Sequence, residues 1–349
     1  MVDTDFISIL KNYRDLVSPV VLRYLSESLQ FPQYCQIDPA HQAELDFQEK
    51  LISEYPRRFG KYLRPSLVMA TALAMGAKTE AVLLTAAAMQ LSEEWILIHD
   101  DIEDDSEERR GSPTLQKLFN VPLAVNAGDA LHVIMWKIIG DIDNKKVFNE
   151  FYQLLNRTTL GQTIDIHWNT QNKLDITDED IFLILESKTC YYTISGPMRL
   201  GAIVAGSTDS QLNTIYLFGR YLGRAFQIID DILDLTSDFA GLKKQSFNDI
   251  YEGKRTIPLS HLLKLANAEE LSTIKSIYSK TRAQKSESEV ATIINLMNKY
   301  HTIDSARDMA KNFAQAAKKM LNEKMSFIRI EPYRHQLETA IDFIVSRDH

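Results

Sequence analysis

The sequence has few of the residues that break helices and few cysteines. Only 13 Gly and 10 Pro occur in 349 residues, so long segments lack the turn signals that separate short strands. The two cysteines, Cys35 and Cys190, are far apart and lack metal-ligand spacing. This pattern excludes a disulfide framework and favours a reducing cytoplasm, with Cys190 packed rather than reactive.

Excess positive charge and long apolar runs are also absent. The formal net charge of -8 argues against nucleic acid as the main partner, because neutralising phosphates needs clustered Lys and Arg in excess. Apolar runs such as 95–98 and 133–136 are far shorter than the roughly 20 residues that span a bilayer. The first residues also lack the basic and apolar regions of a secretory signal. We expect a soluble cytoplasmic protein with no stable membrane insertion.

Most of the sequence shows the apolar spacing of helices. The composition, 45% hydrophobic and 25% charged, is that of a globular protein with an ample core. Because apolar residues recur at helical spacing along most of the sequence, we predict an all-α fold. No composition shift, low-complexity tract or short repeat marks a domain boundary, so we predict a single domain over residues 1–349. The segments of strongest helical character are 65–77, 80–98, 125–139, 148–166, 178–205, 210–235, 257–265, 289–300 and 303–321.

Two aspartate-rich motifs stand out in this helical background. They are Asp100-Asp101-Ile102-Glu103-Asp104 and Asp230-Asp231-Ile232-Leu233-Asp234. Residues four apart share one face of a helix, so the first and last aspartate of each motif point the same way. Such a pair forms a two-pronged clamp, and carboxylates on facing helices of a bundle are a known metal-site geometry.

The alternative is that these motifs are ordinary charged surface. That interpretation suits the run 103–108 taken alone, but each motif follows directly on an apolar stretch, 95–98 or 226–229. An ordinary solvent-exposed face would not explain why an apolar stretch directly precedes both motifs. Carboxylates are hard ligands that suit Mg²⁺, which keeps several waters and shares its shell with phosphate oxygens. The motifs therefore predict a magnesium site that takes a diphosphate.

Cations that could hold a diphosphate lie near both motifs and elsewhere. They occur in Gly60-Lys61-Tyr62-Leu63-Arg64-Pro65, Arg109-Arg110-Gly111, Lys188-Thr189 and Glu252-Gly253-Lys254-Arg255-Thr256. The first of these opens a helix, whose N-terminal dipole favours anions. Any one basic pair is more typical of solvated surface, but together with the two acidic motifs they predict a site with both metal and phosphate ligands.

The order of these motifs resembles that of the trans-isoprenyl (polyprenyl) diphosphate synthases, and in particular the short-chain farnesyl and geranylgeranyl diphosphate synthases. The resemblance covers nearly the whole chain and includes Asn126-Ala127-Gly128-Asp129-Ala130, Gly161-Gln162, 226–234 and 249–256. It implies a helical bundle of the isoprenoid synthase type with a central active-site cavity, and a homodimer. It also implies Mg²⁺-dependent head-to-tail condensation, in which an allylic diphosphate ionises and isopentenyl diphosphate attacks the cation.

The resemblance also implies roles for individual residues. Three Mg²⁺ ions are expected, two held by Asp100 and Asp104 and one by Asp230, with Asp101 and Asp234 in support. The residues expected at the allylic diphosphate or its ligands are Arg109, Lys188, Gln227 and Lys254. Those expected at isopentenyl diphosphate are Gly60, Lys61, Arg64 and Arg110. Thr189 is expected near the reacting carbons, and the leaving diphosphate is expected to serve as base.

The sequence departs from this family pattern at two places. Glu93 stands seven residues before Asp100, where many relatives carry a neutral His or Gln that helps to bind isopentenyl diphosphate. A carboxylate there would repel a diphosphate unless it is protonated or paired with Lys61, Arg64 or Arg110. The usual Gly-Lys after the second motif is replaced by Gly241-Leu242-Lys243-Lys244, so Lys243 and Lys244 are candidate substrate-binding residues in a shifted position.

Residues just before the first motif are expected to set product length. Trp95 and Ile96 lie five and four residues before Asp100, about one helical turn below it. A Trp there would make a shallow floor, with Ser92 leaving some extra space, and this predicts a C15 to C20 product. The alternative is that Trp95 merely fills core.

Two other functions share some of these features. A class I terpene cyclase or an altered-acceptor enzyme would use the same ionisation without isopentenyl diphosphate, and Glu93 is its only support. A non-catalytic subunit that regulates a partner synthase is the other alternative, but such proteins usually lose an aspartate motif and this chain keeps both.

Overall fold

The computed structural model describes residues 2–236 and 247–346, so Lys243 and Lys244 lie outside the described residues. Its long helices are α1 (Val2–Glu27), α2 (Gln42–Arg57), α3 (Leu63–Ala74), α4 (Thr79–Glu103), α6 (Val121–Ile142), α7 (Lys145–Thr170), α10 (Asp209–Thr236), α13 (Ala268–Tyr278), α14 (Glu287–Lys299), α15 (Thr302–Lys324) and α16 (Tyr333–Ser346). Shorter helices are α5 (Leu115–Leu118), α8 (Asp178–Ile184), α9 (Gly196–Val204), α11 (Asn248–Glu252) and α12 (Ile257–Leu265). The remaining described elements are a π-helix, η3 (Leu185–Ser195), three 3₁₀ turns, η1 (Gln33–Cys35), η2 (Pro39–His41) and η4 (Arg282–Gln284), and a hairpin of β1 (Glu108–Arg109) and β2 (Ser112–Pro113).

The all-α prediction is confirmed, and each segment expected to be helical coincides largely with helix, although 65–77 extends past the end of α3 at Ala74. The sequence analysis did not single out α1, α2, α13 and α16. These helices bury only a narrow stripe: α2, for example, buries Leu51, Ile52 and Tyr55 near its end. The four helices contain more polar residues than α3 and α4, so their sequences have a lower density of apolar residues.

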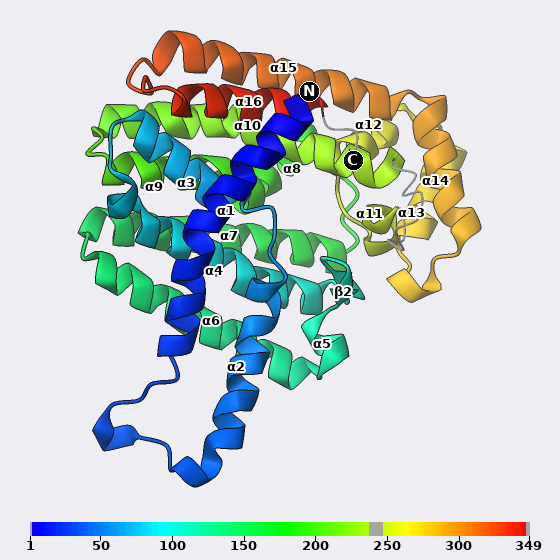
Figure 1. Ribbon diagram of the computed structural model, residues 1–349. Helices are drawn as coiled ribbons and strands as arrows, with labels where there is room; N and C mark the ends of the chain where they lie inside the picture. The colour runs from blue at the N-terminus through cyan, green and yellow to red at the C-terminus, as the bar shows by residue number, and fades with distance from the viewer. Residues whose placement is uncertain (1, 237–246, 347–349) are drawn as a thin grey trace.

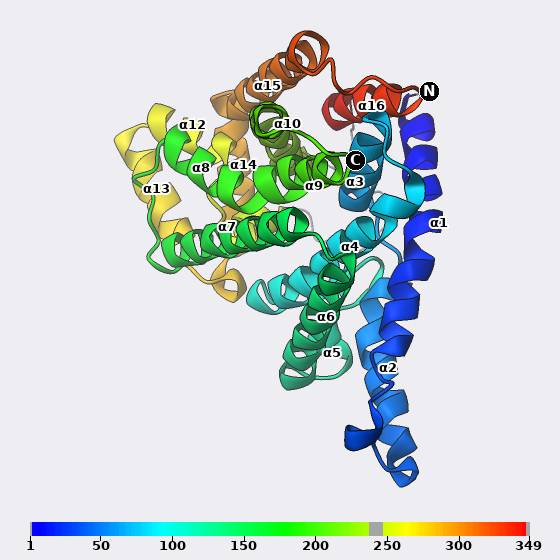
Figure 2. The same ribbon diagram turned by 90° about the vertical axis from the view of Figure 1, so that its left-hand side faces the viewer.

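Long helices cross one another around a shared interior (Figure 1, Figure 2). The most extensive packing joins α4 to α6, α10 to the segment η3 (Leu185–Ser195), α10 to α15, and α3 to α9. α1 runs along the outer side of this group, and the segment from its end through α2 projects away from the rest (Figure 2). The catalytically promising motifs lie at the ends of α4 and α10, which belong to the packed interior.

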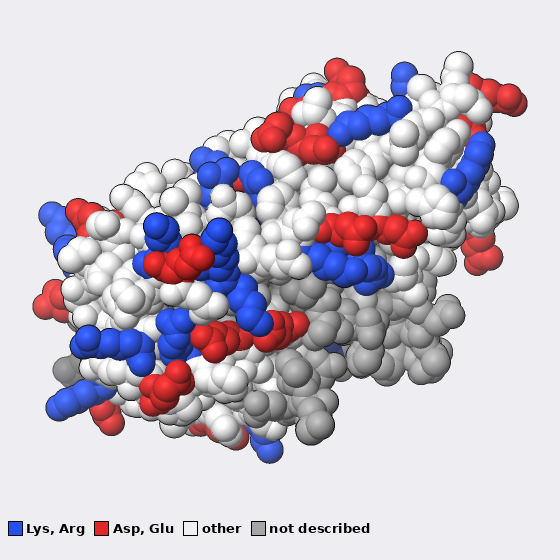
Figure 3. All heavy atoms as spheres, turned by 90° about the horizontal axis from the view of Figure 1, so that it is seen from above, with Lys and Arg blue, Asp and Glu red and all other residues white. Residues whose placement is uncertain are grey.

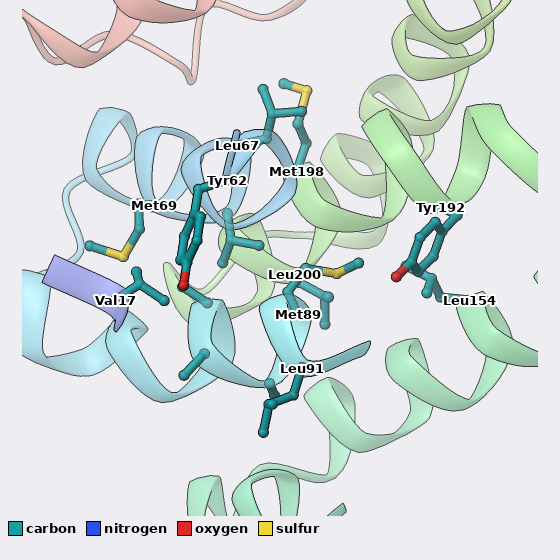
Figure 4. Packing of buried hydrophobic residues seen from close by; sticks show 14 of the residues in the cluster. Val17, Tyr62, Leu67, Met69, Met89, Leu91, Leu154, Tyr192, Met198 and Leu200 are labelled. Carbon is teal, nitrogen blue, oxygen red and sulfur yellow. The ribbon is translucent and has the colours of Figure 1, made fainter. Parts of the chain in front are cut away.

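The main hydrophobic core lies where α3, α4 and α9 meet. Tyr62, Met69, Met89 and Leu200 are among its buried members and come together from separate elements (Figure 4). A second core cluster includes Phe182, Ile232 and Ile293, and the half-buried Phe313 packs against both clusters. The two cores are therefore in contact, and the single-domain organisation stays a prediction.

α4 is the one described helix that is long and apolar enough to cross a membrane by length and composition, but 67% of the relevant window is buried inside the protein. Burial on most sides is what a core helix of a globular fold shows. Its last turns carry Glu93, Glu94 and the first aspartate motif. α4 therefore combines a buried apolar length with a charged end.

The segment 178–205 was predicted as one helix but is divided into three. Between α8 and α9 lies a π-helix, η3 (Leu185–Ser195). The N–H of Gly196 donates to the carbonyl of Tyr191, five residues earlier, and Pro197 has no N–H to continue the α-helical pattern. π-Helical turns are often found at functional sites, and this one carries Lys188 and Thr189.

Charged side chains are mixed on the face seen in Figure 3. There the described Lys and Arg side chains alternate with Asp and Glu instead of gathering into one patch. The run 103–108 is largely exposed, as its composition suggested, with Glu103, Asp105 and Glu107 all at the surface. Cys190 is fully buried, and burial raises the pKa of its thiol, so it is packed as predicted.

Candidate functional site

The first aspartate motif forms the last turn of α4, and its three aspartates have different surroundings. Asp101 is fully buried, and its carboxylate accepts hydrogen bonds from the Tyr55 hydroxyl at 2.6 Å and from Nε of Arg109 at 3.0 Å. A second guanidinium nitrogen of Arg109 also donates to it. Asp101 therefore orients Arg109, and its own carboxylate is already occupied by protein donors.

The loop after α4 is held in place by a tight hairpin. β1 pairs with β2, and the two residues between them, Arg110 and Gly111, both have positive φ, 55° and 74°. A two-residue turn with positive φ at both positions matches the twist of the flanking strands. Arg58 fixes the hairpin by donating to the carbonyls of Arg109 at 3.0 Å and Pro113 at 2.9 Å. This geometry sends the adjacent side chains of Arg109 and Arg110 to different partners.

Asp100 and Asp104 share one face at the end of α4, as their spacing predicts. Nζ of Lys188, from the π-helix, lies 3.7 Å from the Asp100 carboxylate and 3.2 Å from that of Asp165 on α7. Burial and the negative charge of Asp100 together raise the pKa of Asp104 to about 7. Two neighbouring carboxylates in a poorly solvated place favour the uptake of a cation.

α7 and the π-helix come close enough to bring these residues together because Gly161 has no side chain. A Cβ on Gly161 would lie 2.5 Å from the backbone nitrogen of Lys188. The next residue, Gln162, donates to Asp100 at 3.3 Å and to Glu103. The Gly161-Gln162 pair noted in the sequence therefore serves both packing and the polar site.

The second motif lies in the last turns of α10. Asp230 is exposed, whereas Asp231 is buried and accepts a hydrogen bond from Gln227 at 2.9 Å. Burial raises the pKa of Asp231 well above its usual range. The Thr189 hydroxyl donates to the side-chain carbonyl of Gln227 at 3.0 Å. Gln227 thus links the second motif to the π-helix that carries Lys188.

A short helix, α11, adds acidic residues that the sequence analysis did not select. The backbone N–H of Asp249 donates to Asp234 at 2.9 Å, which ties α11 to the end of α10. Nζ of Lys254 lies 3.2 Å from Asp249 and 2.9 Å from Glu252. Burial raises the pKa of Asp249 to about 7, while the charge on Lys254 lowers it. Asp249 and Glu252 lie in the run 249–256, of which only Lys254 was predicted as a site residue.

Lys254 connects the two motifs. Burial alone would lower its pKa, but the negative charges of Asp249, Glu252 and Asp104 raise it well above the usual value. Asp104 comes from α4 and Asp249 from α11, so carboxylates from distant parts of the chain converge on this ammonium group. We call Asp100, Asp104, Asp231, Asp234 and Asp249, together with Lys188 and Lys254, the acidic cluster.

A second group of charges lies further along α4. Glu93 Oε1 lies 3.1 Å from Arg64 and 3.9 Å from Arg110, and Glu94 lies 2.9 Å from Arg110. A Cβ on Gly60 would lie 2.5 Å from the Arg110 guanidinium, so Gly60 leaves the room this arginine occupies. We call Arg64, Arg110, Glu93 and Glu94 the arginine cluster.

Of the other residues predicted for this region, Lys61 is exposed. The pairing of Glu93 with Arg64 and Arg110 was one of the two conditions under which a carboxylate at that position could be tolerated. Glu94 was not foreseen as a site residue. It is fully buried, and burial raises its pKa while the charge on Arg110 opposes the rise.

The residues predicted to set product length lie on α4 beside α6. Trp95 is 8% exposed, and its ring lies 4.6 Å from that of His132 and 5.7 Å from that of His99, between centroids. Ile96 is half-buried and packs against the main core. The Ser92 hydroxyl lies 3.0 Å from that of Tyr192, so Tyr192 fills the space beside Ser92 that the sequence analysis left open.

The acidic cluster fits a magnesium site that is shared with phosphate oxygens better than a site in which protein ligands surround the ion completely. Among the described residues, no three His, Cys, Asp or Glu side chains converge closely enough to hold a metal ion by themselves. Mg²⁺ commonly binds through one or two carboxylates, waters and substrate phosphates. Asp100 and Asp104 would hold it, and Lys188 and Lys254 lie near these carboxylates, where phosphate oxygens would meet them. Asp230, exposed on α10, stays a predicted ligand.

The chain is similar to known proteins in both sequence and fold. Residues 47–297 match the family model described as polyprenyl synthetase. The chain is 32% identical over 276 residues to a geranylgeranyl diphosphate synthase of Sulfolobus acidocaldarius, covering 76% of this chain and 81% of that protein. It is 28% identical over 259 residues to an octaprenyl diphosphate synthase of Haemophilus influenzae, covering 74% and 77%. The crystal structure of a geranylgeranyl pyrophosphate synthetase from Pyrococcus horikoshii superposes with a TM-score of 0.84 at 26% identity, covering 99% of this chain and 100% of that one.

Proposed function

The chain belongs to the polyprenyl synthetase family, and we propose that it condenses isopentenyl diphosphate with an allylic diphosphate to give a C15 to C20 prenyl diphosphate. Family membership identifies a prenyl diphosphate synthase, a prenyltransferase of isoprenoid biosynthesis. The identity of the substrates, the need for magnesium and the product length are parts of the proposal.

The observation that carries the proposal is the convergence of carboxylates from α4, α10 and α11 around two lysines. Asp100 and Asp104 approach Lys188, and Asp104 and Asp249 act on Lys254. A diphosphate with Mg²⁺ satisfies both kinds of group, since phosphate oxygens bind the lysines and complete the metal shell. When bound, the ions would stabilise the charge that develops on the departing diphosphate. Three ions stay a prediction from the family resemblance.

The protein groups would act on the allylic diphosphate by position and charge. Lys188 and Lys254 hold its phosphate oxygens, and Arg109 adds a guanidinium whose direction is fixed by Asp101. Such preorganised charges favour breaking the allylic C–O bond, because the electron pair leaves with the diphosphate. The double bond of isopentenyl diphosphate then forms the new C–C bond, and the proton lost from it passes to the released diphosphate.

Water must be kept from the cation during this step. Next to the acidic cluster, the Thr189 hydroxyl donates a hydrogen bond to the side-chain carbonyl of Gln227. The protein itself therefore supplies a hydrogen-bond partner for both side chains in place of water. Below the first motif, Trp95 and His132 form an aromatic wall. Apolar and internally bonded groups exclude water from a reacting centre.

A short product is the finer part of the proposal. Trp95 supports it, since a large ring one turn below Asp100 limits the depth available to the growing chain. The similar proteins include both geranylgeranyl and octaprenyl diphosphate synthases, so family membership alone does not fix the length.

The proposal is tested by incubating the purified protein with Mg²⁺, isopentenyl diphosphate and each allylic diphosphate in turn. We expect release of diphosphate and a product of 15 to 20 carbons, about three to four five-carbon units, identified by chromatography and mass. Absence of a prenyl product with every allylic diphosphate would contradict the proposed function.

A second candidate is an ionising enzyme that uses no isopentenyl diphosphate. It is favoured by one observation, the pairing of Arg64 and Arg110 with Glu93 and Glu94. Turnover of an allylic diphosphate alone to a hydrocarbon or alcohol, with no elongation on adding isopentenyl diphosphate, would favour this candidate.

We also propose a homodimer in the cytoplasm. Exposed apolar side chains on neighbouring α6 and α7 support a second copy as partner, with Val133 70% exposed and Tyr152 51% exposed. Light scattering should give twice the chain mass, and a monomer would contradict the dimer. The cytoplasmic location rests on cysteine usage and is checked by cell fractionation.

A further inference from the structure

Arg64 in the arginine cluster is surrounded by protein groups on almost every side. Its Nη1 lies 3.1 Å from Glu93, its Nη2 donates to the Thr193 hydroxyl at 2.9 Å, and its guanidinium carbon lies 4.6 Å from the centre of the Tyr192 ring. Its Nε is buried and finds no hydrogen-bond partner among the described residues. The partner carboxylate is also incomplete, because Glu93 Oε2 is buried without a partner there.

The neighbouring pair of Arg110 and Glu94 is bonded more fully. Arg110 Nη1 donates to both Glu94 oxygens, at 3.1 and 2.9 Å, and to the backbone carbonyl of Tyr55 at 3.0 Å. Glu94 also accepts from Gln90 at 2.6 Å and is completely buried. The Arg110–Glu94 ion pair therefore belongs to the packed interior. In the Arg64–Glu93 pair, by contrast, each residue keeps one buried polar atom without a hydrogen-bond partner among the described residues.

The charges of the arginine cluster cancel. Two guanidinium groups, Arg64 and Arg110, face two carboxylates, Glu93 and Glu94. A diphosphate approaching Arg64 would meet Glu93 within a few ångströms of its oxygens, and like charges at that distance repel strongly where solvent is limited. Binding a diphosphate at Arg64 thus requires the Glu93 carboxylate to leave that guanidinium.

We propose that Glu93 is an internal competitor for the acceptor site: its carboxylate occupies Arg64, an acceptor diphosphate must displace it, and Glu93 thereby sets the affinity for isopentenyl diphosphate. The proposal rests on the proposed function, since it takes Arg64 to be an acceptor-binding residue. The missing partners at Arg64 Nε and Glu93 Oε2 are the geometric basis, because a pair that leaves buried polar atoms unsatisfied is easier to exchange than the complete Arg110–Glu94 pair.

The opposite role for Glu93 would be to position Arg64 for the substrate. The two roles predict opposite signs for Glu93→Gln, which removes the charge and keeps the size. If Glu93 competes, the amide relieves the repulsion and binding of isopentenyl diphosphate becomes tighter. If Glu93 positions Arg64, the same change weakens binding.

The experiment compares steady-state kinetics of the full chain and Glu93→Gln. We expect the KM for isopentenyl diphosphate to fall about tenfold, the effect of relieving one close repulsion in a partly buried site, with kcat and the KM for the allylic diphosphate nearly unchanged. Glu338→Gln is the matched control, because Glu338 pairs with Arg334 at 3.2 Å on α16, away from both clusters, and it should leave all three constants unchanged. An unchanged or raised KM for isopentenyl diphosphate in Glu93→Gln overturns the proposal.

A binding measurement separates this inference from the proposed function. Calorimetric titration with inorganic diphosphate in the presence of a chelator requires no turnover and no metal. Glu93→Gln should tighten this binding about tenfold, and Arg64→Ala in the Glu93→Gln background should remove the gain, since the two residues act on one interaction. If the wild-type chain makes no prenyl product but this pattern holds, the proposed function fails and the competition stands. If prenyl product forms but the pattern is absent, only the competition fails.

Discussion

The acidic cluster and the arginine cluster both include residues of α4, but their charge balance differs. In the acidic cluster the carboxylates outnumber the lysines, and burial and mutual repulsion raise the pKa values of Asp104 and Asp249 to about 7. In the arginine cluster each guanidinium already has a carboxylate. The difference teaches that the first region lacks positive charge and requires an added cation, whereas the second must release an internal anion before it can bind an external one.

The largest expected effect comes from removing a carboxylate that is proposed to hold magnesium. Asp100→Asn should lower kcat about 10³-fold, because the charge that stabilises the departing diphosphate loses its support, and product formation measures it. Asp230→Asn is expected to behave in the same way. Asp105→Asn is the control, since Asp105 is exposed and pairs with Lys117 at 3.0 Å. Full activity in Asp100→Asn would refute the metal assignment.

The next largest effect concerns stability in the arginine cluster. Glu94→Ala should lower the free energy of unfolding by about 3–5 kcal/mol, because it leaves the Arg110 charge poorly solvated and without its partner. Urea unfolding followed by circular dichroism measures the change. Glu93→Gln serves as comparison and should cost much less. Equal losses in the two variants would show that the pairs do not differ as their hydrogen bonds indicate.

Magnesium should stabilise the folded protein through the acidic cluster alone. At an ion concentration one hundred times its dissociation constant, binding adds about 2.7 kcal/mol, so thermal unfolding should shift upward and a chelator should reverse the shift. Asp100→Asn should reduce this response, and Glu93→Gln should keep it. The same response in both variants would mean that the ion binds elsewhere.

The smallest expected effect is a change in the chain length of the product, in a variant that keeps all residues of both clusters. Trp95→Ala should lengthen the product by about one or two five-carbon units, because removing the indole opens depth below the first motif. Mass spectrometry of the products measures the length. Leu265→Ala, at an exposed position of α12, is the control for general loss of stability. An unchanged product length in Trp95→Ala would mean that the ring only fills core.

The helices and the aspartate motifs could be predicted because both depend on local spacing. Apolar residues at helical period made α3, α4 and α10 visible, and a four-residue spacing placed Asp100 and Asp104 on one face. The π-helix was missed because apolar spacing does not distinguish a π-helix from an α-helix, and its close approach to Gly161 on α7 is a tertiary contact. The N-terminal helices were missed because they contain many polar residues and therefore have a lower density of apolar residues than α3 or α4.

The roles of individual acidic residues could not be predicted from spacing. Asp101 resembles Asp100 in sequence, yet Tyr55 and Arg109 surround it, and these partners come from α2 and from the hairpin. Glu94 adjoins Glu93, but one helical step turns it into the interior against Arg110. Asp249 and Glu252 joined the site only when α11 docked on the end of α10.

By itself the sequence determined the helical class, the family and the kinds of group that the site contains, since these follow from residue type and near-neighbour spacing. Only the tertiary structure decided which charges face one another. Coulomb energies and desolvation depend on distances and burial across the fold, and residues far apart in the chain set both. For this reason the sequence presented Glu93 as an anomaly, and the structure made it the partner of Arg64.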